Sequence, residues 1–146
     1  MGHITFIADF KAPRERVWKL FTDPDLWSQW NTELSDIRDV RGPFDHPGRG
    51  YTQVVRFLGR EYLGTWEVTA CEPETWRTVA GTLPFGAPFL ARDRFEEADG
   101  VTRVTVEIEW KMPWGWIGRT IEFLTLPLMR RQFAANARRA AALLDR

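Results

Sequence analysis

The stretch that decides the fold is residues 120–145, TIEFLTLPLMRRQFAANARRAAALLD. Apolar residues recur at helical spacing, in one stripe over residues 117–128 and a second, rotated stripe over 129–144. Pro127 falls where the stripe changes, so we expect a kink there. A helix over 120–145 would measure about 39 Å at 1.5 Å per residue, which is long enough to cross a whole sheet.

Five extended segments precede this helix, with turn residues between them: residues 51–58, 62–71, 75–83, 88–97 and 101–112. Strands at this spacing favour an antiparallel meander over crossover units. Asp99-Gly100 is the strongest hairpin signal in the chain.

The first 50 residues predict one more strand at each end and two short helices between them. Residues 3–10 alternate at period two, and residues 34–40 form a weak, polar strand that we expect at an edge. A helix should begin near Pro13, and a second one at Asp23-Pro24, where an aspartate cap precedes a proline. Residues 41–50 are a loop by composition.

Side-chain alternation assigns the two faces of the predicted sheet. In the last strand the apolar side chains share one face, which we take as the inner one, while Glu107 and Glu109 share a solvated face. A two-residue turn at Gly59-Arg60 would place Phe57 opposite Tyr62, Val55 opposite Gly64 and Gln53 opposite Trp66. The remaining inward side chains are predicted to be Phe89, Ala91, Asp93 and Phe95 in one strand and Trp76, Thr78 and Ala80 in another.

The inner face must be covered, and the long helix is the available cover. A single helix is only about 10 Å across and cannot fill a broad curved sheet. We therefore expect open space under its first half, beneath the stripe that ends at Leu128. Aromatic residues make up 14% of the chain, including eight tryptophans, which suggests that the rings surround something.

Composition excludes several classes of function. Twenty basic residues balance twenty acidic ones among 146, so nucleic acid is a poor partner. The single cysteine, Cys71, excludes an intrachain disulfide, and with His3 and His46 it forms no zinc motif; we predict no metal and no cofactor. No signal peptide is visible, and residues 112–129 are interrupted by charges and prolines, so we expect a cytoplasmic protein.

The order of these elements resembles the START-like helix-grip superfamily, which includes polyketide cyclases, coenzyme Q-binding proteins and Bet v 1-like carriers. The matching stretches are Ala12-Pro13 through Val17-Trp18 and Phe21, Asp23-Pro24 to Trp30-Asn31, Trp66-Glu67-Val68 leading to Glu72-Pro73, Gly100-Val101-Thr102, and the arginine-rich Ala/Leu ending. The polyketide cyclase/dehydrase and lipid-transport branch is the most similar. The resemblance implies an α+β helix-grip fold over residues 1–146 as one domain, with a hydrophobic small molecule held in an apolar cavity between a curved antiparallel sheet and the long helix.

Residue patterns and resemblance together give a set of candidate ligand-binding residues. They are Gln53, Phe57, Tyr62, Trp66, Thr78, Phe85, Phe89, Asp93, Val106, Ile108, Trp110, Ile121, Leu124 and Leu128. Asp93 is the weak catalytic candidate, since an inner carboxylate is costly unless it is paired. A one-residue slip would instead place it outside, beside Arg92 or Arg94. As a ligand anchor, Asp93 should affect binding more than folding when it is replaced by alanine.

Three functions remain open on the sequence. The first is a carrier or sensor of a lipid, quinone or polyketide-like molecule. The second is a polyketide aromatase/cyclase or dehydratase, which would need acid/base groups near the reacting carbons; the inner face offers only Asp93, Tyr62 and a few neutral groups. The third is an interaction module, which requires an exposed apolar patch that the sequence does not reveal.

Three surface features carry further expectations. Residues 83–88 are either a lid that pivots at Gly86 or an ordinary proline-stiffened turn. Trp114 and Trp116 lie either at the mouth of the cavity or in the packing at the start of the helix. Arginines of the last helix either form its solvated face or make transient contact with an anionic membrane: Arg130, Arg131, Arg138, Arg139 and Arg146.

Overall fold

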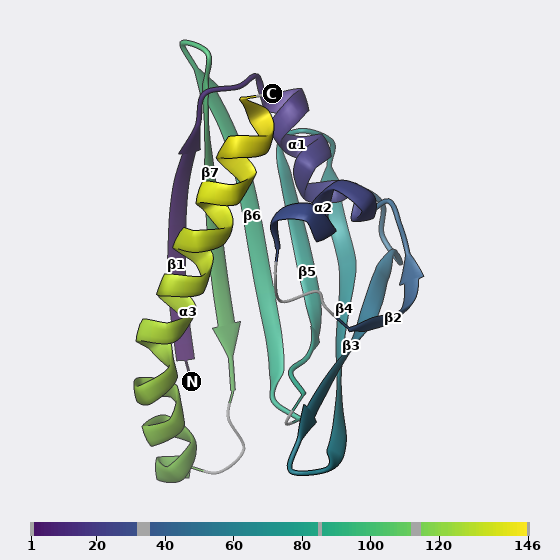
Figure 1. Ribbon diagram of the computed structural model, residues 1–146, viewed down its shortest axis with the longest axis vertical. Coiled ribbons are helices and arrows are strands. Elements are labelled where there is room, and N and C mark those ends of the chain that lie inside the picture. Colours follow the sequence, from purple (N-terminus) through teal and green to yellow (C-terminus); the bar gives the residue numbers. More distant parts are fainter. Residues whose placement is uncertain (1, 32–35, 85, 112–114, 146) are drawn as a thin grey trace.

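The computed structural model describes residues 2–31, 36–84, 86–111 and 115–145, without the side chains of Phe57, Ile121 and Glu122. In chain order its elements are β1 (Gly2–Phe10), α1 (Arg14–Thr22), α2 (Pro24–Trp30), β2 (Ile37–Arg41), β3 (Gly50–Phe57), β4 (Arg60–Glu72), β5 (Trp76–Thr82), β6 (Pro88–Ala98), β7 (Val101–Trp110) and α3 (Gly115–Leu144). The strands form one curved antiparallel sheet in the order β1-β7-β6-β5-β4-β3-β2 (Figure 1). The predicted α+β helix-grip architecture is confirmed.

The helices all lie on one face of this sheet, which we call the inner face (Figure 1). The helices α1 and α2 and the C-terminal half of α3 cover its upper part, as drawn. The N-terminal half of α3 continues along β1 and β7 to the lower end, where the β3–β4 turn also lies. The two ends of the sheet therefore have different covers.

Local sequence accounts for the start of α2. The Asp23 carboxylate accepts a hydrogen bond from the backbone N–H of Asp25, and Pro24 occupies the first turn, where a missing N–H costs nothing.

The edge strand β2 is short and polar, as predicted, and its register with β3 shifts between Arg38 and Arg41. Such irregularity discourages pairing with another chain.

The β3–β4 turn differs from the prediction by one position. It is formed by Leu58 and Gly59, both with positive φ, and pairs Phe57 with Arg60 and Val55 with Tyr62. Two positive φ angles are what a tight hairpin turn between twisted strands requires. Since each partner shifts by two residues, every side chain keeps the face that was predicted for it.

The prediction for β5 is wrong: Arg77 and Val79 face inward, while Trp76, Thr78 and Ala80 lie on the outer face. The sequence pattern favours the inner face for the large aromatic residue, Trp76. The charged Arg77 is buried instead because Asp93, its partner across the β5–β6 ladder, neutralises it.

The helix α3 begins five residues earlier than predicted and is continuous through Pro127. Its second apolar stripe faces the sheet, as Phe133 shows by stacking on Phe6 of β1 with ring centroids 4.4 Å apart. Leu126 and Met129 pack in the same cluster. The first stripe is not packed on the sheet, because Ile117, Leu124 and Leu128 are all exposed.

Candidate functional site

The upper half of the inner face is filled by rings. Trp27, Phe44, Tyr51 and Trp66 are in mutual contact, with Tyr51 stacked on Trp66 at 5.2 Å. We call these four residues the aromatic plug. A second set of rings from α1, α2 and β6 packs beside it: Trp18, Phe21, Trp30 and Phe95. The many tryptophans therefore fill space at this end.

The aromatic plug lies against a buried charge. The Arg77 guanidinium carbon is 5.0 Å from the centroid of Trp66 and 5.9 Å from that of Trp27. Two guanidinium nitrogens donate to one oxygen of Asp93, at 2.6 and 3.0 Å. The third donates to the backbone carbonyls of Phe21 and Phe44. Arg77 thus joins β5 to β6, to the end of α1 and to the loop before β3.

This geometry places Asp93 on the inner face, as predicted, and supplies the partner that the sequence analysis missed. An inward carboxylate needs a cation beside it, but only the register of the ladder, in which Arg77 lies directly opposite Asp93, identifies that cation.

Two other polar groups lie close to the aromatic plug. Burial raises the pKa of the Cys71 thiol, and the nearby Asp45 carboxylate raises it further, against the opposing effect of Arg77. The thiol donates to the Asp45 backbone carbonyl at 3.0 Å, a contact that also favours its protonated form. The indole N–H of Trp27 is buried and has no hydrogen-bond partner among the described residues.

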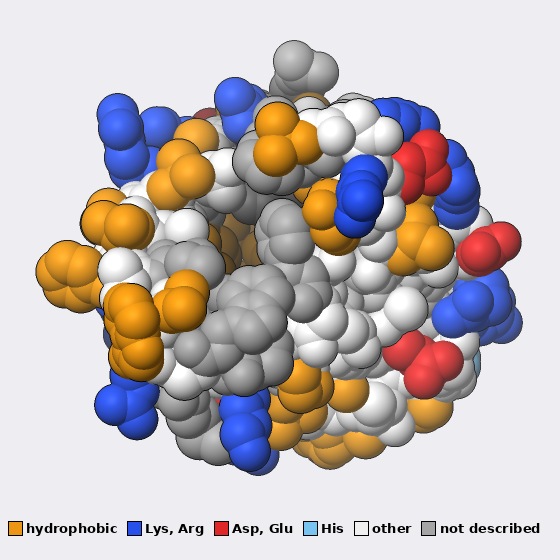
Figure 2. All heavy atoms as spheres, turned by 90° about the horizontal axis from the view of Figure 1, so that it is seen from below, with side chains coloured by type: hydrophobic (Ala, Val, Ile, Leu, Met, Phe, Trp, Pro, Cys, Tyr) orange, Lys and Arg blue, Asp and Glu red, His pale blue; other side chains and the backbone are white. Residues whose placement is uncertain are grey.

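The inner face loses its cover toward the lower end. In the upper half Val79, Phe95 and Val104 are at most 1% exposed, whereas Val106, Ile108 and Phe89, further down the same sheet, are only half-buried. Seen from below, the molecule has a hollow at this end, with hydrophobic side chains in and around it (Figure 2). This end is our candidate functional site.

The predicted site residues divide into four groups by position. Half-buried on the inner face are Gln53, Tyr62, Trp66, Phe89, Val106 and Ile108, while Trp110 is buried in a cluster with Ile4 and Phe6. Leu124 and Leu128 are exposed on α3. Thr78 is on the outer face, which is a correction. Phe85 and the side chains of Phe57 and Ile121 lie outside the described structure, as do Trp114 and part of the proposed lid.

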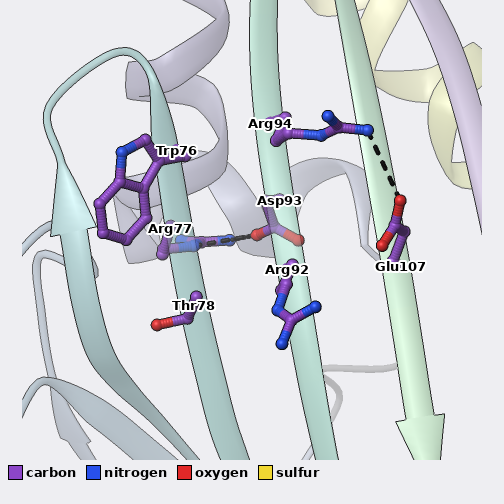
Figure 3. Close-up of a pocket in the computed structure, with 7 residues that line it drawn as sticks. All are labelled: Trp76, Arg77, Thr78, Arg92, Asp93, Arg94 and Glu107. Atoms are coloured by element: carbon purple, nitrogen blue, oxygen red, sulfur yellow. Dashed lines mark hydrogen bonds and ion pairs between the residues drawn. The ribbon is translucent and has the colours of Figure 1, made fainter.

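A second pocket, of about 270 Å³, lies over β5, β6 and β7 (Figure 3). It is lined by Trp76, Arg77, Thr78, Arg92, Asp93, Arg94 and Glu107, and Arg94 approaches the Glu107 carboxylate at 3.5 Å. This mostly charged lining contrasts with the apolar side chains of the lower inner face.

Neither a metal site nor a membrane-spanning helix is found in the described part of the chain. The described residues contain no group of His, Cys, Asp and Glu side chains that could hold a metal ion. No helix among them has the length and apolar character needed to cross a bilayer.

A curved antiparallel sheet gripped by one long helix defines the helix-grip class. The chain belongs to the polyketide cyclase / dehydrase and lipid transport family, whose model matches residues 1–146. The resemblance seen in the sequence is thereby confirmed. A search of curated proteins found no match.

Solved structures with the same fold come from several sources. A Rhodobacter sphaeroides protein has a TM-score of 0.74 at 18% identity, covering 98% of this chain and 91% of its own. The Mycobacterium smegmatis protein Ms6760 has a TM-score of 0.69 at 22% identity, covering 97% and 90%. DynU16, a protein of the dynemicin biosynthetic locus, has a TM-score of 0.68 at 16% identity, and the match covers 98% of this chain but 47% of DynU16.

Proposed function

We propose that this protein binds a hydrophobic small molecule, of the lipid, quinone or polyketide-like class, in the hollow between the lower inner face and the N-terminal half of α3. The observation that carries this proposal is an uncovered apolar surface of the sheet at the hollow. Phe89, Val106 and Ile108 are only half-buried, although they lie on the inner face. An apolar ligand would remove this surface from water at about 25 cal/mol per Å².

Binding is favoured over catalysis by the polar groups available. Among the described inner-face positions of the lower half, the polar side chains are Gln53 and Tyr62, with Tyr51 at the boundary, and none is a carboxylate or an imidazole. The Asp93 carboxylate lies higher and is bound to Arg77. Acid/base catalysis needs a proton donor or acceptor within hydrogen-bond reach of the substrate. We therefore propose a carrier or sensor, and make the cyclase or dehydratase an outcome of the test.

The experiment begins with native mass spectrometry of freshly purified protein, followed by organic extraction. We expect a co-purified hydrophobic molecule that unfolding releases. The Ile108→Trp variant should fill the hollow, lowering affinity for the extracted molecule or for the probe 1-anilinonaphthalene-8-sulfonate by about tenfold or more while unfolding like the wild type. Ile7→Trp is the matched control, because Ile7 is exposed on the outer face of β1 and should leave binding unchanged.

Two results would contradict the proposal. One is that Ile108→Trp destabilises the fold by about 1–3 kcal/mol, as in a closed core, and that no hydrophobic molecule binds the wild type. The other is turnover of a poly-β-keto substrate, which would assign an enzyme to the same site.

A further inference from the structure

The N-terminal half of α3 exposes more large apolar side chains than the ligand site explains. Trp116 and Phe123 are each 76% exposed. We call Trp116 and Phe123 the apolar rim. Scattered exposed leucines are ordinary on a protein surface, but two large aromatic side chains about two helical turns apart on one flank mark an interaction surface.

Helix geometry separates the rim from the ligand site. Viewed down the axis of α3, its large apolar side chains fall into three groups, and each group is separated from the next by about 100° or more. Leu126, Met129 and Phe133 point to the sheet, and Ile117, Leu124 and Leu128 lie about 140–180° round the helix from Phe133. Trp116 and Phe123 lie about 80–100° from Phe133, on the side of α3 away from the middle strands, so filling the hollow would leave them in water. A partner outside the molecule is needed to cover them.

The charges around the rim indicate what that partner is. At 100° per residue, Arg119 and Arg130 share the flank of Trp116 and Phe123, and both are exposed. Residues 115–144 hold five arginines and a single acidic residue, although the whole chain is neutral. Figure 2 shows basic side chains flanking the hydrophobic ones at this end, with most of the visible acidic side chains across the molecule.

We propose that the apolar rim docks on the surface of an anionic lipid bilayer. Trp116 and Phe123 enter the boundary between headgroups and acyl chains, where amphipathic and apolar rings gain most. Arg119 and Arg130 face the lipid phosphates, each adding electrostatic attraction that falls off within a Debye length. A second copy of the chain fits this surface less well, because a symmetric contact would bring two cationic helices together. Docking stands independently of the proposed function, although it would place the hollow beside the membrane.

The test is co-sedimentation with vesicles of phosphatidylcholine alone or with roughly 30% phosphatidylglycerol, at low and high salt. We expect binding to the anionic vesicles that salt weakens. The double variants Trp116→Ser/Phe123→Ser and Arg119→Glu/Arg130→Glu should each reduce partitioning by about tenfold or more. The controls are Ile7→Ser, an exposed apolar residue of β1, and Arg138→Glu, an exposed arginine eight residues further along α3 than Arg130; both should bind like the wild type.

Failure of docking and failure of ligand binding give different results. Trp116→Ser/Phe123→Ser should keep its affinity for 1-anilinonaphthalene-8-sulfonate in solution, and Ile108→Trp should keep its affinity for anionic vesicles. Wild-type protein that stays in the supernatant with both vesicles would overturn the docking proposal. So would a wild-type dimer in sedimentation velocity that Trp116→Ser/Phe123→Ser converts to monomer, because the rim would then be a protein interface.

Discussion

Arg77 is buried to 2% exposure, and its guanidinium uses all three nitrogens. Its position between two tryptophan rings and the Asp93 carboxylate satisfies the charge. From this pairing we now expect that replacing Asp93 affects folding more than ligand binding. The carboxylate holds Arg77, which in turn holds the carbonyls of Phe21 and Phe44.

The first prediction follows from this pair. Arg77→Leu and Asp93→Leu should each lower the free energy of unfolding by about 3–5 kcal/mol, because each leaves one buried charge without its partner. The double variant should cost clearly less than the sum, since both charges are then removed. Urea denaturation of the four proteins measures this coupling. If the loss in the double variant equals the sum of the two single losses, the interaction between Arg77 and Asp93 contributes no free energy to folding.

At the scale of elements, α3 consists of two halves with different roles. The C-terminal half packs on β1, α1 and α2, and Arg16 of α1 donates to the Leu144 carbonyl at its end. Among the described side chains, the N-terminal half meets the sheet only through Leu126 and Met129. The rest of its apolar surface is available to a ligand and a membrane under the two proposals above.

The second prediction compares two phenylalanines of this helix. Phe133→Ala should destabilise the protein by about 2–4 kcal/mol, because it removes the ring stacked on Phe6 and leaves a cavity between α3 and β1. Phe123→Ala should change stability by less than about 0.5 kcal/mol, since that side chain is exposed. Thermal and urea unfolding distinguish the two variants. Equal losses would mean that α3 rests on the sheet through both flanks.

At the scale of the whole molecule, the sheet has one closed end and one open end. The aromatic plug and the Arg77–Asp93 pair close the upper end, and the lower end keeps half-exposed apolar side chains facing a sparsely packed helix (Figures 1 and 2). We expect the lower end to open locally at a smaller free-energy cost than the upper end, because that cost follows the density of buried contacts.

The third prediction concerns amide hydrogen exchange. Amides of residues 117–128 should exchange faster than those of residues 133–144, since the first half of α3 has fewer packed side chains to hold it. A bound hydrophobic ligand or anionic vesicles should slow exchange in residues 117–128 and leave residues 133–144 unchanged. Uniform protection along α3 in the free protein would contradict the division of the helix.

Much of the architecture follows from the sequence alone. Period-two alternation defined β1 and β7, the Asp23-Pro24 cap defined α2, and the long apolar periodicity defined α3, because each signal is local and survives any tertiary arrangement. The inward position of Asp93 was also predictable, since the alternating apolar residues of β6 fix its parity.

Only the tertiary structure decided which of two apolar stripes of α3 meets the sheet, and which face of β5 is buried. Both stripes have helical spacing, so the choice depends on the shape of the surface opposite, where Phe6 receives Phe133. Arg77 is buried because a residue sixteen positions away neutralises it, and no local pattern encodes that contact. Periodicity fixes which residues share a face, whereas long-range packing and charge pairing decide where that face points.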